Sequence, residues 1–260
     1  MSLFRRPAIA AAAAAFALAP MAGLAAPVYG PALSSLSFHP MVHAGGSTPF
    51  FVSHGFGANA TVTSTNWSGY AATGSTYTSV STTFKQPAVT CSSGDQYSSF
   101  WVGLDGYSSS SVEQTGTEAD CVGRTAEYSS WYELYPANPV NYSNTVRAGD
   151  SITETVTFSG SSTYTMTIKD STEGWTKTTT KSSSGHARSS AEVIAEAPYS
   201  GGVLPLADFG KVSFSGSTVN GSTLSSFSPT AINMVSSSGA AEATTGSLSG
   251  GSFSITWNSR

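Results

Sequence analysis

Residues 151–170 read SITETVTFSGSSTYTMTIKD, and this stretch decides the fold class. Apolar side chains alternate with threonines in 151–158 and again in 163–168, and the cluster Ser-Gly-Ser-Ser at 159–162 separates the two halves. A period of two residues that is rich in β-branched side chains predicts a half-buried strand. The Ser/Gly cluster predicts a turn, so the stretch indicates two strands joined by a tight connection.

The same signals recur on both sides of this stretch. Residues 80–84 are short and rich in β-formers, and further Ser/Gly turn clusters lie at 182–185 and 236–239. We find no convincing amphipathic helix after the N-terminal 25 residues. Aromatic residues make up 11% of the 260-residue chain, which argues against disorder. Many short strands with regular turns predict an all-β protein, an antiparallel sandwich.

The N-terminal 25 residues have the features of a secretory signal. Arg5 and Arg6 supply the basic start, the Ala-rich run 9–18 is apolar, and Gly23-Leu24-Ala25 offers small residues for cleavage. A membrane anchor is the alternative, but the run is too short for a span and Pro20 interrupts it. We therefore predict that residues 1–25 are a signal peptide and that the protein is secreted.

Residues 26–60 differ from the rest of the chain. They contain four prolines and no acidic residue, and three of the four histidines fall here: His39, His43 and His54. Neither a period of 2 nor one of 3.6 persists, so we interpret the segment as a propeptide or a flexible N-terminal extension. Residues 61–260 then form the β-sandwich domain.

Charge and cysteine content exclude several classes of function. The formal net charge is −4 and no Asp or Glu precedes Asp95, so the chain has no electrostatic reason to bind nucleic acid. Cys91 and Cys121 are the two cysteines, and one disulfide fits an exported protein better than two free thiols do. Such a bridge contributes about 3–4 kcal/mol in the chain-entropy model. Without a CxxC or HExxH pattern, no metal site is expected.

Three strand-like segments each combine an apolar face with a face of aromatic and acidic side chains. Alternation along a strand separates the two faces. A cleft floor of this kind stacks a substrate and performs acid–base chemistry. The aromatic and acidic faces carry Trp101 and Asp105 in 100–105, Trp131 and Glu133 in 131–135, and Glu192 and Glu196 in 192–196.

Five motifs in their order along the chain resemble the glutamic peptidases (eqolisins), and the resemblance covers residues from about 66 to 200. It implies an acid endopeptidase of a bacterial-type branch, without a cofactor. It also implies a concanavalin-A-like sandwich of two curved antiparallel sheets with the active site on the concave face. The motifs are NWSGY at 66–70, FWVGLDG at 100–106, VEQTG at 112–116, WYELYP at 131–136 and AEVIAE at 191–196.

The resemblance assigns roles to particular residues. Gln114 and Glu196 match the catalytic pair, and Trp101, Asp105 and Glu133 match cleft positions associated with substrate binding. Trp131, which shares the face of Glu133, is assigned to the same cleft. Three departures leave the pair intact but affect the subsites: Glu118 where the fungal enzymes have Asp, Ser129 where they have Asp, and Leu134 where they have Trp.

The pair suits peptide hydrolysis in acid. A free Glu has a pKa of about 4.3, so Glu196 remains partly ionised in mild acid and takes a proton from the attacking water. Gln114 does not titrate; its carbonyl oxygen positions the water and its N–H groups stabilise the oxyanion. We expect both side chains to face solvent in the cleft.

Two other classes of function remain open at this stage. A concave β-sandwich glycoside hydrolase would use Glu133 and Glu196 as its carboxylate pair, at a separation of about 5–9.5 Å. A secreted carbohydrate-binding module or adhesin would use the aromatic cleft without catalysis. For the peptidase, the expected partners are protein or peptide substrates, with no nucleic acid and no membrane after signal cleavage, and the chain is expected to be a monomer.

Overall fold

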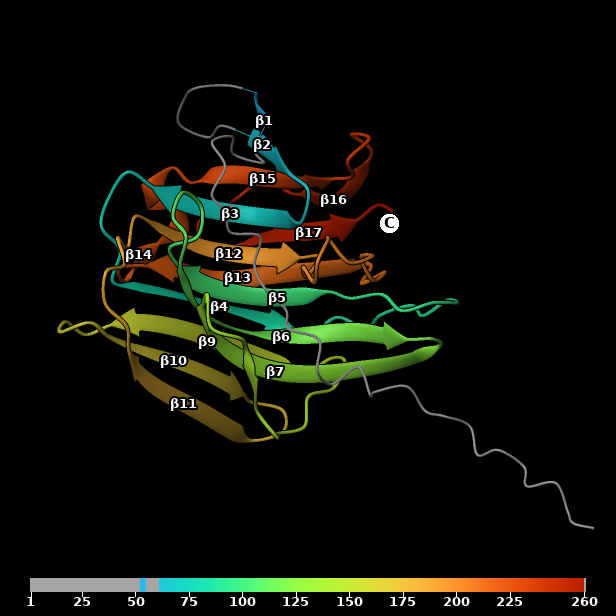
Figure 1. Ribbon diagram of the computed structural model, residues 1–260, viewed down its shortest axis with the longest axis horizontal. Coiled ribbons are helices and arrows are strands. Elements are labelled where there is room, and N and C mark those ends of the chain that lie inside the picture. The colour runs from blue at the N-terminus through green and yellow to red at the C-terminus, as the bar shows by residue number, and fades with distance from the viewer. Residues whose placement is uncertain (1–51, 55–60, 260) are drawn as a thin grey trace, which may run out of the picture. The chain divides into compact units, whose positions relative to one another are not determined.

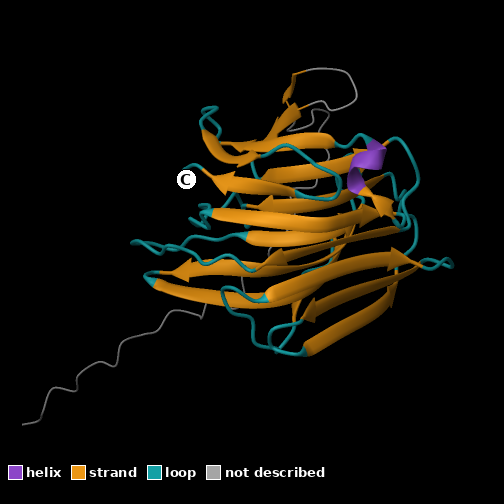
Figure 2. Cartoon of the chain, turned by 180° about the vertical axis from the view of Figure 1, so that it is seen from behind, coloured by secondary structure: helices purple, strands orange, loops and turns teal. Residues whose placement is uncertain are grey.

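The computed structural model describes residues 52–54 and 61–259, and these residues confirm the prediction of an all-β, essentially antiparallel protein (Figure 1). Seen from behind, the described chain is almost entirely strand and loop (Figure 2). Its elements are β1 (Val52–His54), β2 (Thr61–Ser64), β3 (Trp67–Thr73), β4 (Ser79–Lys85), β5 (Ser99–Leu104), β6 (Val112–Val122), β7 (Thr125–Tyr135), β8 (Val140–Asn141), β9 (Ser151–Phe158), β10 (Thr163–Asp170), β11 (Trp175–Ser182), β12 (Ser190–Glu196), β13 (Lys211–Val219), β14 (Ser222–Thr223), the 3-10 helix η2 (Leu224–Phe227), β15 (Thr230–Val235), β16 (Ala241–Thr245) and β17 (Phe253–Trp257).

The stretch quoted first forms the antiparallel pair β9–β10, with Phe158 opposite Tyr164 and Ile152 opposite Asp170. Its apolar positions are buried and its threonines are half-exposed, as the period of two predicts. Glu154 is the exception, because it occupies a buried position between Ile152 and Val156.

Strand pairing follows two runs. The first run is β1-β2-β15-β3-β12-β5-β6-β7-β8, and the second is β11-β10-β9-β4-β13-β17-β16. The runs meet where β16 pairs with β15. Among the described strands, β2 and β15 make the one parallel pair. The strands β3, β12, β5, β6 and β7 therefore lie side by side near the middle of the first run (Figure 1).

The first run buries both of its faces, because alternate side chains enter two separate hydrophobic clusters. Phe100, Val102 and Leu104 of β5 belong to the larger cluster, together with many side chains of the second run. Trp101 belongs to the smaller cluster on the opposite face, with Trp131 of β7. The predicted division of these strands into an apolar face and an aromatic, acidic face is confirmed.

The Cys91–Cys121 disulfide is present, as predicted. Cys121 lies in β6, and Cys91 lies in the segment between β4 and β5, so the bridge closes a loop with a sequence separation of 30 residues. This loop includes all of β5 and most of β6, the two strands that carry Trp101 and Gln114. Both cysteines are therefore disulfide-bonded, and neither is a free thiol.

The expected signal peptide, residues 1–25, lies outside the described residues, and of the segment 26–60 only β1 is described. β1 pairs with β2 in antiparallel register, Val52 opposite Thr63 and His54 opposite Thr61. β2 is itself paired with β15 and so belongs to the sheet. In the described part of the chain, no helix is long and apolar enough to cross a membrane.

Candidate active site

The register of five strands places the predicted site residues on one face of the sheet, with Gln114 and Glu196 on either side of β5 and opposite positions four residues apart along it. Gln114 on β6 lies opposite Glu133 on β7 and opposite Gly103 on β5. Glu196 at the end of β12 lies opposite Ser99 on β5 and opposite Trp67 on β3. Side chains at paired positions point to the same face of a sheet. All of these residues therefore contribute to the aromatic and acidic face of the first run.

Gln114 is held by one hydrogen bond and has further capacity. Its Nε2 donates to Oε2 of Glu133 at 2.5 Å. A primary amide carries two N–H donors, so one remains for a substrate. The Oε1 of Gln114 is buried and has no hydrogen-bond partner among the described residues. A buried amide oxygen without a partner is costly, so this atom is placed to accept a hydrogen bond from a bound water or substrate.

Each carboxylate oxygen of Glu196 accepts a hydrogen bond, and Trp67 interacts with the same carboxylate. Nε1 of Trp101 donates to its Oε2 at 2.8 Å, and Nδ2 of Asn66 donates to its Oε1 at 3.1 Å. The sequence assigned Trp101 to the site but not Asn66, which lies in the short connection between β2 and β3. Two donors on one carboxylate favour its ionised form.

The environment of Glu196 has opposing effects on its pKa. Burial raises the pKa of this carboxyl well above its ordinary value, and the negative charge of Glu133 raises it further, while hydrogen bonds from Trp101, Trp67 and Asn66 lower it. The net direction is upward, which differs from the ordinary value that the sequence suggested. In acid the ionised fraction is therefore smaller than for a free Glu, but the ionised carboxylate is a stronger base.

The indole of Trp101 extends between Gln114 and Glu196, and two glycines make room for it. A Cβ at Gly103 would lie 2.9 Å from Cζ3 of Trp101 and 3.3 Å from Cβ of Gln114. A Cβ at Gly116 would lie 2.6 Å from Cβ of Trp101 and 2.9 Å from Cζ2 of Trp131. No real Cβ tolerates contacts below 3.0 Å, so any side chain at these positions would displace the tryptophans.

We predicted that Gln114 and Glu196 face solvent in a cleft, but in the structure of the full-length chain both side chains are buried. Gln114 and Glu196 are 0% and 3% exposed, and Trp101, Trp131 and Glu133 are buried as well. The two tryptophans lie on the predicted face, but they pack in the smaller hydrophobic cluster. The other members of this cluster are Val62, Trp67, Ala71, Val112, Ile194 and Ile232, with Tyr107 and Tyr135 packed against it.

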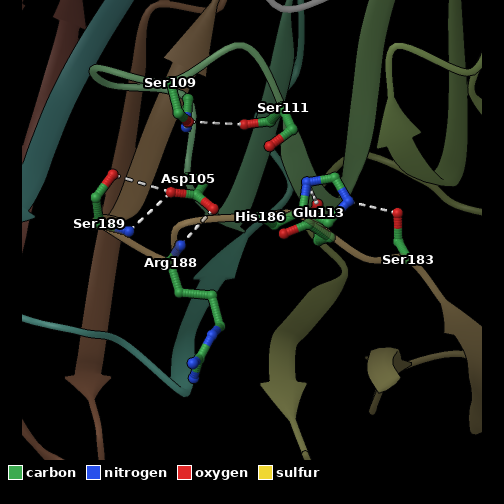
Figure 3. Close-up of polar contacts among 9 residues, drawn as sticks. Asp105, Ser109, Ser111, Glu113, Ser183, His186, Arg188 and Ser189 are labelled. Atoms are coloured by element: carbon green, nitrogen blue, oxygen red, sulfur yellow. Dashed lines mark hydrogen bonds and ion pairs between the residues drawn. The ribbon is translucent and has the colours of Figure 1, made fainter. Parts of the chain in front are cut away.

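Asp105 is not brought to Gln114 and Glu196. β5 ends at Leu104, and Asp105 follows in a left-handed conformation with φ 68°, so strand alternation no longer determines its direction. Its carboxylate accepts hydrogen bonds from the backbone N–H of Arg188 at 2.6 Å and of Ser189 at 2.7 Å (Figure 3). Asp105 therefore anchors the loop that leads into β12 and supports the strand that carries Glu196.

A second link holds the same loop. Nδ1 of His186 lies 3.1 Å from Oε1 of Glu113 on β6, and its Nε2 lies 2.5 Å from Oγ of Ser183 (Figure 3). His186 lies in the loop between β11 and β12, and these two contacts tie the loop to β6 and to the end of β11. Burial and the charge of Asp105 raise the pKa of Glu113 to about 8.

Acidic side chains extend the site beyond Glu196. Glu118 lies opposite Ser99, which in turn lies opposite Glu196, so the three residues follow one line across β6, β5 and β12. Oγ of Ser129 donates to Oε2 of Glu118 at 2.7 Å. Burial and the charge of Glu133 raise the pKa of Glu118 to about 7, while the Ser129 hydroxyl lowers it. In acid, Glu118 is therefore neutral and hydrogen-bonding rather than anionic.

The fold and the site together define a β-protein with a buried Gln–Glu pair, the class of the glutamic peptidases. The model of the Peptidase A4 family matches residues 65–257, and the chain belongs to this family. Aspergillopepsin-2 of Aspergillus niger is 30% identical over 221 residues, which cover 75% of this chain and 78% of the relative. Scytalidopepsin B of Scytalidium lignicola is 33% identical over 175 residues, 65% of this chain and 61% of the relative.

Solved structures agree with this membership. A crystal structure of scytalido-glutamic peptidase with a transition-state analogue inhibitor matches with a TM-score of 0.67 at 26% identity. The match covers 75% of this chain and 98% of the scytalido-glutamic peptidase chain. Aspergilloglutamic peptidase from Aspergillus niger has a TM-score of 0.55 at 30% identity, and covers 63% and 99%. This chain is thus a glutamic-type acid endopeptidase acting on proteins or peptides, which decides against the glycoside hydrolase and binding-module alternatives.

Proposed function

We propose that Glu196 is the general base and acid of peptide-bond hydrolysis and that Gln114 stabilises the oxyanion. Two observations support the proposal. The Glu196 carboxylate accepts hydrogen bonds from Trp101 and Asn66. The Gln114 amide bonds Glu133 through one N–H, while its oxygen has no partner among the described residues. These are the groups that activation of a water and stabilisation of a tetrahedral intermediate require.

The proposed reaction has two steps. First, ionised Glu196 takes a proton from a water whose oxygen bonds to the scissile carbonyl carbon, and the carbonyl electron pair moves to the oxygen. Gln114 positions the water through Oε1 and donates its free N–H to that oxyanion. In the second step protonated Glu196 gives its proton to the amide nitrogen, the C–N bond breaks, and an acid and an amine leave.

Glu133 is proposed to orient Gln114, because it accepts a hydrogen bond from Nε2. Replacing Glu133 with Gln retains an acceptor but lets the new amide turn, so we expect kcat to fall by about tenfold while folding is retained. The measurement is peptide hydrolysis in acid. A loss as large as that of a Glu196→Gln variant would mean that Glu133 takes part in the chemistry itself.

We further propose that the two strand runs are the two layers of a concanavalin-A-like sandwich, with the site on the concave face. Side chains from both runs share the larger hydrophobic cluster. In it the rings of Phe100 and Phe84, one from each run, have centroids 6.1 Å apart. This arrangement leaves the opposite face of the first run for Trp101, Gln114 and Glu196.

We also propose that the protein is secreted and monomeric, and that residues 26–60 are a propeptide. The composition of residues 26–60, with four prolines and no acidic residue, supports the propeptide. β2 is paired in the sheet from Thr61, so removal of the segment before residue 61 leaves the first run intact apart from β1.

The precursor is expected to remove its own N-terminal segment in acid. Wild-type chain shifted to pH 3–4 should shorten without added protease, because the site becomes active, whereas a Glu196→Ala precursor should stay intact. Mass spectrometry of the intact chain measures both. Shortening of the Glu196→Ala precursor, freed of other proteases, would show that the processing is not its own.

A further inference from the structure

Asn66 contacts Glu196 from the short connection between β2 and β3. Its side chain is 2% exposed, and its Nδ2 donates to Oε1 of Glu196. Its backbone oxygen accepts a hydrogen bond from the N–H of Ala197 at 2.8 Å, so main chain and side chain both bind the end of β12. The main-chain contact is independent of the side chain.

Ser64 determines which way the Asn66 amide faces. Oγ of Ser64 accepts the backbone N–H groups of Asn66 at 3.3 Å and of Trp67 at 3.1 Å, which uses both of its lone pairs. Its single hydroxyl proton is then donated to Oδ1 of Asn66 at 3.1 Å. If the amide were reversed, its NH₂ group would face a hydroxyl that cannot accept another hydrogen bond.

As a consequence, the Glu196 carboxylate faces only hydrogen-bond donors where it contacts Trp101 and Asn66. Trp101 Nε1 is a donor only, and Asn66 is held so that it presents only N–H. Neither group accepts a proton from a protonated Glu196. The contacts therefore oppose burial, which favours the neutral carboxyl.

We propose that Asn66, oriented by Ser64, is a positioning residue that increases the ionised fraction of Glu196 in acid, against the effect of burial, and favours transfer of its acquired proton to the leaving amine. This inference rests on the assignment of Glu196 as the base. The titratable group that faces Glu196 is Glu133 from β7, while β5 and β3 contribute Trp101 and Trp67. Glu133 opposes ionisation, so the donors carry that task.

The test is the pH profile of an Asn66→Ala variant of the full-length chain, activated in acid. Loss of one hydrogen bond to the charged form of Glu196 is expected to move the acidic limb of the kcat profile to higher pH by about one unit. The variant's kcat should therefore be about tenfold below that of the wild type near pH 3 and nearly equal to it at higher pH. KM is expected to remain nearly unchanged. Asn66→Asp, equal in size, is expected to be at least as impaired above the ordinary Asp pKa of about 3.9, because an ionised carboxylate donates nothing and repels Glu196.

Two further variants separate this role from a structural one. Ser64→Ala leaves Asn66 in place but frees its amide, so the acidic limb is expected to move in the same direction by a smaller amount. Asn220→Ala removes an Asn that accepts bonds from Thr78 and Ser79 far along the chain; it should lower the melting temperature without moving the limb.

The outcomes decide between the possibilities. An Asn66→Ala variant that loses the same factor at every pH, or an Asn66→Asp variant with wild-type activity, would overturn the inference. If Asn66→Ala does not fold, Asn66→Asp and Ser64→Ala give the answer. A Glu196→Gln enzyme with normal turnover would instead overturn the assignment of the base, so the two failures are distinguishable.

Discussion

A Glu196→Gln enzyme is expected to lose about three to four orders of magnitude in kcat. Gln matches Glu in size and still receives a hydrogen bond from Trp101, but it takes no proton from water, and general acid–base catalysis accounts for a loss of up to about 10⁴-fold. Gln114→Ala is expected to lose about 10²–10³-fold, the usual effect of removing one oxyanion donor. Steady-state peptide hydrolysis in acid measures both.

Controls for these variants come from buried residues of the same type outside the site. Gln96 is buried and binds Ser92 through Nε2, so Gln96→Ala tests what the loss of a buried Gln costs by itself. Since Gln114 and Glu196 are buried, the melting temperature of each variant must be measured beside its activity. Near-normal turnover of either the Glu196→Gln or the Gln114→Ala enzyme would refute the proposed pair.

The protein is expected to be most stable in acid and to lose stability steadily as the pH rises from about 4 to 8. The physical reason is a set of buried carboxyls whose pKa values are raised, in each case first of all by burial. Burial raises the pKa of Glu113 to about 8 and that of Glu118 to about 7. The pKa is raised in the same direction for Asp120, Glu154, Glu192 and Glu196.

The sign follows from proton binding. Below about pH 4 these carboxyls are mainly protonated in both the folded and the unfolded chain, so their burial lowers the free energy of unfolding least there. As the pH rises, the unfolded chain releases its protons first, so unfolding becomes more favourable until the folded pKa is passed. For Glu113 alone the difference in the free energy of unfolding amounts to about 5 kcal/mol.

Thermal unfolding followed by circular dichroism from pH 3 to 8 measures this effect. A loss of about 5 kcal/mol corresponds to a decrease of about 10–20 °C in Tm for a chain of this size. At low pH the chain has only 11 Lys and Arg, so repulsion between positive charges remains modest. A Tm that rises between pH 4 and 8 would contradict the prediction.

Glu154 offers the sharpest single-residue test. It is 0% exposed in the larger core, between Ile152 and Val156, and neither carboxyl oxygen has a hydrogen-bond partner among the described residues. Glu154→Gln should raise Tm at pH 7–8, change it little at pH 3, and leave peptide hydrolysis unaltered. Glu127→Gln, a change at an exposed position of β7, should alter the pH dependence of Tm only slightly, through the loss of its charge beside Asp120.

The sequence alone predicted β4, β5, β9, β10, β12 and the second half of β7, and the face that many of their side chains occupy. The period of two places Phe100, Val102 and Leu104 opposite Trp101 because neighbouring side chains of a strand point to opposite sides. It also predicted the disulfide, because a chain that is expected to be exported and has two cysteines is expected to pair them. The candidate pair Gln114 and Glu196 came from motifs whose order along the chain is specific.

Alternation failed where the strand ended. Asp105 follows β5 in a left-handed conformation, and its carboxylate turns to the loop at Arg188 and Ser189 rather than to the face of Trp101. The Asp105-Gly106 dipeptide in FWVGLDG is a turn signal, which indicates the end of the strand but not the partner of the Asp105 side chain. The contact is formed with residues more than 80 positions away, which a local pattern does not encode.

Tertiary structure alone decided the chemical environment of the site. Asn66 is 130 positions from Glu196 and Trp101 is 95, so the two hydrogen bonds on the carboxylate exist only because β3, β12 and β5 pair in one register. The burial that raises the pKa of Glu196 likewise results from strands packed together. A sequence names the ionisable groups, but their pKa depends on desolvation and neighbouring dipoles, and folding alone supplies these.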